Sequence, residues 1–237
     1  MRLDRLLDGV AVLDAPPGAP AIDVAAIAYD SRAVTPGALF CCVPGAAFDG
    51  HDFAVDAAAA GAVALLVERR VDVPVPQIVV SSVRVVMPVL ACRLYGDPSR
   101  GLTVAGVTGT NGKTTVTHFL QAVFEAHGWR AAVIGTLSGT RTTPEAPDLQ
   151  AQFARLKDDG MAAVATEVSS HALAQCRVDG THFASATFTN LTQDHLDFHG
   201  TMDEYFAAKA RLFEPDRAGV AIVNTDDAWG LRLSTMV

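Results

Sequence analysis

The stretch Leu102-Thr-Val-Ala-Gly-Val-Thr-Gly-Thr-Asn-Gly-Lys-Thr-Thr115 decides the fold of this chain. An apolar, β-branched run, which predicts a buried strand, passes into glycines and then into a Gly-Lys-Thr junction that opens a helix. Gly106, Gly109 and Gly112 let the backbone turn tightly, so that successive N–H groups can face one anion while the helix adds the positive end of its dipole. The stretch therefore predicts a phosphate-binding loop.

The spacing departs by one residue from the Walker pattern G-x-x-x-x-G-K-[ST], whose first glycine would fall at Val107. A glycine-rich turn that carries a surface lysine is the structural alternative. The strand before the loop, the helix after it and the Gly-Lys-Thr junction favour a nucleotide site. In such a site Lys113 reaches the β- and γ-phosphates, and the Thr114 hydroxyl ligates Mg²⁺.

Composition limits the classes of function that the chain can have. Its 237 residues are 50% hydrophobic, which is enough for two modest domains with buried cores. With 18 basic and 26 acidic residues, the chain has no overall positive charge to attract nucleic acid or an anionic membrane. Any anionic ligand must therefore be held by local groups such as the glycine loop.

The sequence shows no clear pattern of a disulfide framework, a signal peptide or a membrane span. The four cysteines show neither metal-site spacing nor a disulfide framework. No uncharged apolar run approaches the roughly 18 residues of a membrane span, and Asp4 and Asp8 interrupt any signal peptide. We expect a cytoplasmic protein with reduced thiols and no membrane insertion.

The order of the predicted elements indicates an α/β fold with two domains, at residues 1–98 and 99–237. The first is a small α/β domain with strands at residues 22–30, 38–43, 62–67 and 77–80. A turn-rich linker at residues 96–101 follows it. In the second domain, strands at residues 102–108, 131–134, 162–167, 184–189 and 220–223 alternate with helices, which predicts a mostly parallel sheet with ligands at the carboxyl ends of its strands.

Three features of the sequence, two in the second domain and one in the first, each have a chemical and a structural interpretation. Glu167 closes an apolar strand, where it either ligates Mg²⁺ beside Thr114 or faces solvent. Lys209 lies on the apolar face of the helix at residues 201–213, so its amine either snorkels outward or is drawn into a site. Asp30-Ser31-Arg32 taken alone favours an ordinary turn at a strand end. The histidines His171, His195 and His199 do not have the spacing of a structural zinc site.

Taken together, several motifs resemble those of the Mur ligases in order and spacing. They are Thr108-Gly-Thr-Asn-Gly-Lys-Thr-Thr115, Glu167-Val-Ser-Ser-His171, Thr189-Asn-Leu-Thr-Gln-Asp-His-Leu-Asp197, Tyr205-Phe-Ala-Ala-Lys209 and Asn224-Thr-Asp-Asp227. Asp30-Ser31-Arg32 with Pro36-Gly-Ala-Leu-Phe40 is similar to the members of the family that add the third peptide residue to UDP-N-acetylmuramoyl-L-alanyl-D-glutamate. The resemblance runs from near residue 25 to the end of the chain.

The resemblance implies ATP and Mg²⁺ as cofactors, and it implies a role for residues of the loop and the later motifs. The ATP-binding residues would be Gly109, Thr110, Asn111, Gly112, Lys113, Thr114 and Thr115. Thr114 and Glu167 would hold one Mg²⁺, and His195 with Lys209 would lie near a second. In the family the lysine at this position is N-carboxylated, which turns a cation into an anionic oxygen ligand. The expected catalytic residues are Lys113, Glu167, His195 and Lys209.

The same resemblance implies a UDP-N-acetylmuramoyl dipeptide and an amino acid as substrates. Tyr29 and Ser31 would contact the uridine diphosphate end, while the muramoyl-peptide end would be held by Thr142, Thr143, Ser169, Gln175 and Arg177. Residues 45–48 depart from the family, because they are small or aromatic where polar uridine-binding side chains are common. The implied reaction forms an acyl phosphate from the substrate carboxylate and ATP, and an amine then displaces the phosphate.

Family members carry a longer central domain and a third domain, so the resemblance implies that this chain is a fragment or a truncated product. The central sheet would then be incomplete and would present an apolar edge. Two alternatives stay open: a folylpolyglutamate-synthase type of ligase, which is disfavoured because such proteins begin close to their phosphate loop, and a non-catalytic nucleotide or UDP-sugar binding module. The sequence specifies neither the added amino acid nor the oligomeric state.

Overall fold

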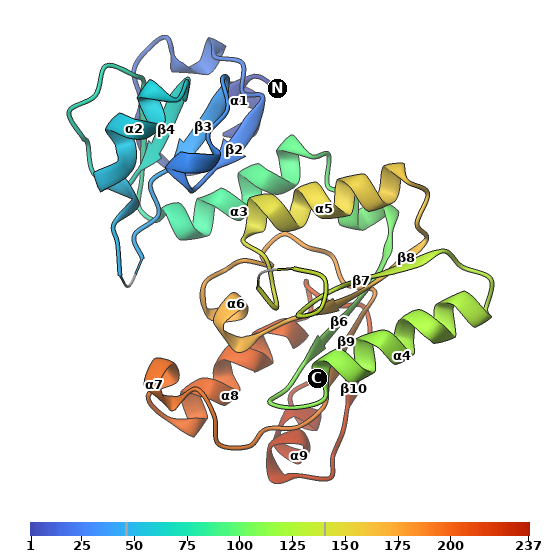
Figure 1. Cartoon of the computed structure of the whole chain (residues 1–237). Helices are drawn as coiled ribbons and strands as arrows, with labels where there is room; N and C mark the ends of the chain where they lie inside the picture. The colour runs from blue at the N-terminus through green and yellow to red at the C-terminus, as the bar shows by residue number, and fades with distance from the viewer. Residues whose placement is uncertain (46, 140) are drawn as a thin grey trace. The chain divides into compact units, whose positions relative to one another are not determined.

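A computed structural model describes residues 1–45, 47–139 and 141–237 of the chain (Figure 1). Ala46, which belongs to the unusual stretch at residues 45–48, and Thr140 lie outside the described residues. The chain divides into two compact units, Met1–Leu94 and Tyr95–Val237. Each unit has its own sheet and its own buried apolar residues, so we describe each by itself.

The first unit has a five-stranded sheet in the order β1-β5-β4-β3-β2. Strands β2 to β5 are parallel to one another, and β1 is antiparallel to β5. Every residue of β3 and β4 is buried, because apolar side chains cover both faces of the sheet. The strands are β1 (Val12–Asp14), β2 (Ala26–Ala28), β3 (Ala38–Cys41), β4 (Ala64–Val67) and β5 (Gln77–Val80), and the helices are α1 (Leu3–Leu6), η1 (Ala19–Ala21), η2 (Ser31–Ala33), η3 (Gly50–Phe53), α2 (Ala54–Ala59) and α3 (Val83–Leu94).

The second unit has a five-stranded sheet in the order β10-β9-β6-β8-β7, and every strand pair in it is parallel. This confirms the predicted α/β class. The strands are β6 (Thr103–Thr108), β7 (Ala131–Ile134), β8 (Ala163–Glu167), β9 (Ser185–Phe188) and β10 (Ala221–Val223), and the helices are η4 (Pro98–Gly101), α4 (Lys113–Ala126), α5 (Ala146–Asp158), α6 (Ser170–Ala174), α7 (Leu196–His199), α8 (Met202–Ala210), η5 (Arg211–Phe213) and α9 (Ala228–Ser234).

The strand that carries the glycine loop lies at the centre of this sheet. β6 pairs with β8 on one side and with β9 on the other, so the loops that follow these three strands meet at one edge. The core of this unit includes Leu149 and Phe153 of α5 and Tyr205 and Phe206 of α8. This topology brings together residues that lie far apart in the sequence.

Two apolar surfaces of the second unit face solvent. Helix α4 packs against β6, β8 and β7, but its Phe119 and Val123 are 67% and 62% exposed. β10 is an edge strand, and Val220 and Ile222 at this edge are also exposed. Among the described residues, no helix combines the length and the apolar character that crossing a bilayer requires.

Gly106 gives a test of the packing at the centre of this sheet. A Cβ added there would lie 2.8 Å from the ring of Phe183, which is itself fully buried. We expect Gly106→Ala to lower the free energy of unfolding by about 1–3 kcal/mol, because the ring has no room to move. Urea denaturation followed by tryptophan fluorescence measures this, since Trp129 and Trp229 both lie in the second unit.

Gly139→Ala is the matched control. A Cβ at Gly139 would have its nearest neighbour at 3.8 Å, in ordinary contact. The free energy of unfolding of the Gly139→Ala variant should stay within about 0.5 kcal/mol of that of the parent chain. Equal stability of the Gly106→Ala variant and the parent would contradict the tight packing.

Candidate functional site

The loop between β6 and α4 is shaped by two glycines. Gly109 has φ +149°, and a Cβ there would lie 1.9 Å from the Thr189 hydroxyl oxygen, so a larger residue does not fit. Gly112 has φ +86° and is the N-cap of α4, where it offers no side chain to the N–H groups of the first helical turn. A glycine cradle that ends in an uncapped helix N-terminus fits an oxyanion such as a phosphate group.

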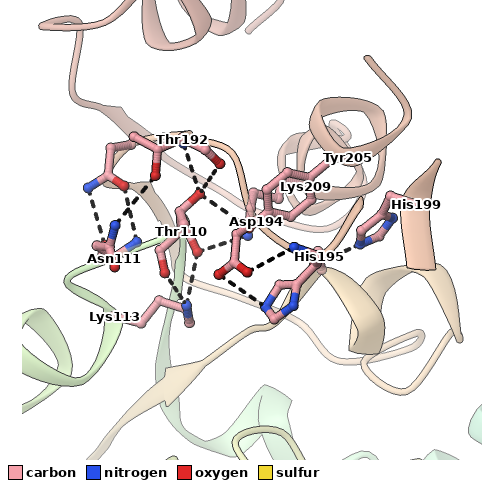
Figure 2. A network of polar contacts seen from close by, with 12 residues as sticks. Thr110, Asn111, Lys113, Thr192, Asp194, His195, His199, Tyr205 and Lys209 are labelled. Carbon is pink, nitrogen blue, oxygen red and sulfur yellow. Dashed lines mark hydrogen bonds and ion pairs between the residues drawn. The ribbon is translucent and has the colours of Figure 1, made fainter. Parts of the chain in front are cut away.

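The loop after β9 holds the glycine loop in place (Figure 2). The Thr189 hydroxyl donates to the Asn111 carbonyl at 2.6 Å, and the Thr110 N–H donates to the Asn190 carbonyl at 2.9 Å. The Thr192 N–H donates to the Thr110 hydroxyl at 3.0 Å. Residues 189–197 were identified from the sequence as a motif, but no site role was predicted for Thr189, Asn190 or Thr192. Their role is to fix the backbone, which no side-chain pattern reveals.

Two of the chain's three lysines meet at one carbonyl of this loop. The Lys113 ammonium donates to the carbonyls of Gly109 and Thr110, both at 2.9 Å, and Lys209 donates to the same Gly109 carbonyl at 2.8 Å. Lys209 is 1% exposed, and its Nζ lies 4.6 Å from the centre of the Tyr205 ring. The alternative in which Lys209 snorkels outward is therefore wrong.

The protein environment disfavours positive charge on both amines. Burial lowers the pKa of Lys113, and the carboxylates of Glu167 and Asp194 oppose this effect. Burial, followed by repulsion from Lys113, lowers the pKa of Lys209 to about 6, again against the attraction of Asp194. Near pH 7 the Lys209 amine is accordingly largely neutral, and a neutral amine has a free electron pair.

Glu167 reaches the same loop from the end of β8. It is 1% exposed, so the solvent-facing alternative is wrong. Its Oε2 accepts a hydrogen bond from the Thr114 hydroxyl at 3.0 Å, and its Oε1 accepts one from the Thr136 N–H at 2.9 Å. A Cβ at Gly135 would lie 2.2 Å from Oε1. The carboxylate is thus held against the first turn of α4.

This pair of oxygen donors fits Mg²⁺. A carboxylate and a threonine hydroxyl are hard oxygen ligands, and Mg²⁺ takes one or two such protein ligands and completes its shell with water and phosphate oxygens. Within residues 1–45, 47–139 and 141–237, no three His, Cys, Asp or Glu side chains converge on a point that could hold a metal.

Three histidine rings gather beside Lys209. The ring of His171 lies 4.8 Å from that of His195 and 5.5 Å from that of His199, measured between ring centres, and His199 stacks on Tyr205 at 4.9 Å. Burial lowers the pKa of His199 to about 4, and the neighbouring His171 adds to this effect. Burial also lowers the pKa of His171. These two rings are neutral near pH 7.

His195 lies at the rim of this group (Figure 2). Its backbone is left-handed, with φ +53°, and its N–H donates to the Asp194 carboxylate at 2.9 Å. The same carboxylate lies 3.6 Å from the ring Nε2. About half of the His195 side chain is exposed, so the ring can reach a ligand.

The candidate substrate residues of the second unit form one group. The Thr143 hydroxyl donates to the Glu167 carbonyl at 2.8 Å and accepts the Ser169 N–H at 3.0 Å. Arg177 donates to the Thr143 carbonyl and to the Gln175 side chain. It also pairs with the buried Glu145 at 3.0 Å, a residue that the sequence did not single out. The Thr142 hydroxyl lies 3.1 Å from the Thr136 hydroxyl, which in turn donates to the Glu167 carboxylate.

The two candidate residues of the first unit lie after β2. Asp30 accepts the Arg32 N–H at 3.0 Å and pairs with the Arg32 guanidinium at 2.6 Å, so it caps the short helix η2 that begins at Ser31. Tyr29 packs partly against the core of this unit. The structural interpretation of Asp30-Ser31-Arg32 as a strand-end turn therefore holds, and this turn places Ser31 at the carboxyl edge of the parallel strands.

Comparison with known proteins places both units in one family. The family profile described as Mur ligase middle domain matches residues 107–237, which is more than half of the chain. The profile described as Mur ligase family, catalytic domain, matches residues 23–92.

Two similar proteins are both named UDP-N-acetylmuramoyl-L-alanyl-D-glutamate–2,6-diaminopimelate ligase. The protein from Geobacillus thermodenitrificans is 48% identical over 222 residues, which cover 86% of this chain and 45% of that protein. The protein from Corynebacterium glutamicum is 44% identical over 260 residues, which cover 99% and 50%. A solved structure of a ligase with the same name has a TM-score of 0.85 and 31% identity, and covers 99% of this chain and 50% of that one. This chain spans about half the length of the curated relatives it matches.

Lys209 makes the stability of the second unit depend on pH. The unfolded chain keeps the Lys209 proton up to a pH near 10.5, whereas the folded chain keeps it only up to a pKa of about 6. Between these values the unfolded state binds more protons, so stability rises with pH, by at most about 1.4 kcal/mol per pH unit. Lys113 and Asp194 are the charged groups that act on Lys209.

We expect Lys209→Met to remove this rise. Urea denaturation of the variant and the parent, at several pH values between about 6.5 and 9.5, measures the slope of stability against pH. Lys157→Met, at an exposed position, is the control and should keep the slope of the parent. A variant slope equal to that of the parent would show that Lys209 is charged in the folded state.

Proposed function

We propose, from the premise that this chain belongs to the Mur ligase family, that it forms the nucleotide- and UDP-muramoyl-binding part of a peptidoglycan-precursor ligase. The proposed reaction adds the third amino acid to UDP-N-acetylmuramoyl-L-alanyl-D-glutamate with consumption of ATP. The added amino acid is 2,6-diaminopimelate, as in the names of the relatives. Because the chain spans about half of those relatives, the full activity belongs to a protein with a second half like theirs.

One observation carries this proposal. Lys113, Lys209 and Glu167 come from three different elements, and all three side chains contact the glycine loop or the first turn of the helix that follows it. Two amines and a metal-binding carboxylate gathered on a glycine cradle suit a triphosphate with Mg²⁺. A sugar or a peptide without phosphate would not need these two lysines and this carboxylate around a glycine loop.

In the proposed reaction the residues mainly position groups and balance charge. Residues 109–115 hold the ATP phosphates, and the Lys113 ammonium balances negative charge that spreads over the transferred phosphoryl group. Thr114 and Glu167 hold one Mg²⁺, which supplies charge neutralisation when bound. Thr143, Ser169 and Arg177 hold the muramoyl-peptide end so that its free carboxylate faces the γ-phosphate. Tyr29 and Ser31 contact the uridine diphosphate end.

Covalent change then occurs in two steps. The substrate carboxylate oxygen bonds to the γ-phosphorus as the bond to ADP breaks, which gives an acyl phosphate. The amine of the incoming amino acid next bonds to the acyl carbon, phosphate leaves with the carbon–oxygen bond electrons, and the amine loses a proton. The chain provides proximity and electrostatic stabilisation, while the acyl phosphate provides the driving force.

Lys209 is proposed to act as an N-carboxylysine. The amine electron pair bonds to the carbon of CO₂, one proton is released, and an anionic carbamate results. Support comes from the burial of the amine beside Lys113 and from its hydrogen bond to the Gly109 carbonyl. The carbamate would place an anion where the amine is otherwise largely neutral, and with His195 it would offer ligands for a second Mg²⁺.

Nucleotide binding tests the core of the proposal. Isothermal titration with ADP should show binding that Mg²⁺ strengthens, and Lys113→Ala should weaken it by at least about tenfold, because a charge-assisted contact to phosphate is lost. Lys157→Ala is the control and should bind like the parent. Titration with the UDP-muramoyl dipeptide should also give binding. A chain that binds neither ligand would overturn the proposal, and one that binds the nucleotide alone would favour a nucleotide-binding module.

Carbon-13 NMR tests the carbamate. Addition of ¹³C-labelled bicarbonate should give a carbamate resonance that Lys209→Arg removes, while Lys157→Arg keeps it. The resonance should weaken as the pH falls toward the Lys209 pKa of about 6, since the protonated amine cannot attack CO₂. A parent chain without a resonance that depends on Lys209 would refute the carbamate and leave nucleotide binding as a separate question.

A further inference from the structure

One residue next to the proposed metal site has no role in the reaction as described so far. Thr136 follows Gly135 just after the edge strand β7, and it contacts both oxygens of Glu167. Its N–H donates to Oε1 at 2.9 Å, and its hydroxyl donates to Oε2 at 3.2 Å. Two contacts from one residue restrict rotation of the carboxylate about its terminal bond.

The neighbouring glycine makes this contact possible. A Cβ at Gly135 would lie 2.2 Å from Oε1 and 2.7 Å from the carboxylate carbon, so the backbone approaches Glu167 more closely than any other residue type allows. This close approach lets the Thr136 N–H reach Oε1. As a result Oε2 is the oxygen that faces the Thr114 hydroxyl at 3.0 Å.

The hydroxyl hydrogen bonds around Thr136 have a defined direction. A carboxylate only accepts hydrogen bonds, so the single hydroxyl hydrogen of Thr136 is used on Glu167. In the contact between the Thr136 and Thr142 hydroxyls, at 3.1 Å, Thr142 must therefore be the donor. The bonds run from Thr142 to Thr136 and from Thr136 to Glu167, and they connect the candidate substrate residues to the phosphate loop.

We propose that Thr136 is a positioning residue that fixes the Glu167 carboxylate for Mg²⁺ and couples it to Thr142. This inference rests on the proposed function, because it assigns a role to the same metal site. Thr136 acts through Glu167 and does not contact the reacting groups itself. Outer hydrogen-bond partners of metal ligands typically contribute 10- to 100-fold to metal affinity, so the effect is large enough to measure.

Thr136→Val is the informative variant, because valine keeps the shape and the N–H and removes only the hydroxyl. The Mg²⁺ affinity of the full chain, measured by titration with saturating ADP present, should fall by about tenfold. ADP affinity without Mg²⁺ should not change. Thr136→Ser keeps the hydroxyl, and its Mg²⁺ affinity should lie within about threefold of that of the parent. Thr235→Val, at an exposed threonine near the end of α9, is the matched control.

The coupling to Thr142 needs a double-mutant cycle. Thr142→Val should weaken Mg²⁺ binding in the parent and should have no further effect in the Thr136→Val background, since the connecting hydroxyl is already gone. Thermal melting of each variant confirms that it is folded.

The outcomes separate this inference from the function on which it rests. If the parent binds ADP with a clear dependence on Mg²⁺ and Thr136→Val behaves like the parent, the positioning role is wrong. The role is equally wrong if Thr136→Ser is as weak as Thr136→Val. If the parent shows no dependence on Mg²⁺, the proposed function fails first and this inference fails with it.

Discussion

The carbonyl of Gly109 is the point on which the rest of the site depends. It accepts hydrogen bonds from Lys113, four residues further along the chain, and from Lys209, which is 100 residues away. Lys209 reaches it because α8 buries Tyr205 and Phe206 in the core of the second unit. Two amines so close together repel each other when charged, and the carboxylates of Glu167 and Asp194 act against that repulsion. An anion bound beside these two amines would favour their protonated form.

The parallel sheet explains why a few residues are enough to build this site. β6 has β8 and β9 as neighbours, so the ends of these strands deliver Glu167 and Thr189 to the two sides of the glycine loop. Gly109 and Gly135 allow these two contacts, because a Cβ at either position would overlap an oxygen of the partner residue. The glycines therefore serve close approach between loops as well as a tight turn.

Much of this arrangement could be predicted from the sequence. The bounds of β5 and β7 and the capping box at Thr201 and Glu204 agree with the pattern of residues, because local periodicity and cap chemistry determine them.

Other features could not be predicted from the sequence. Strand β1 is one of them, since a three-residue strand has no readable alternation. Thr136 and Thr189 were also missed as site residues. Their hydrogen bonds depend on how distant loops meet, and a threonine in a loop gives no sign of its partner. The burial of Lys209 could not be decided either, because an apolar helix face is compatible with a lysine that points inward or outward.

The scarcity of lysine gives this chain an unusual chemical property. Amine-reactive reagents such as acylating esters modify accessible, unprotonated amines, and the chain offers them the α-amino group of Met1 and the side chains of Lys113, Lys157 and Lys209. Lys157 is exposed, while Lys209 is enclosed by α8 and the glycine loop. Acylation of Lys209 by a bulky ester therefore requires the second unit to open, so mass spectrometry of the modified peptides would report local unfolding at the site itself.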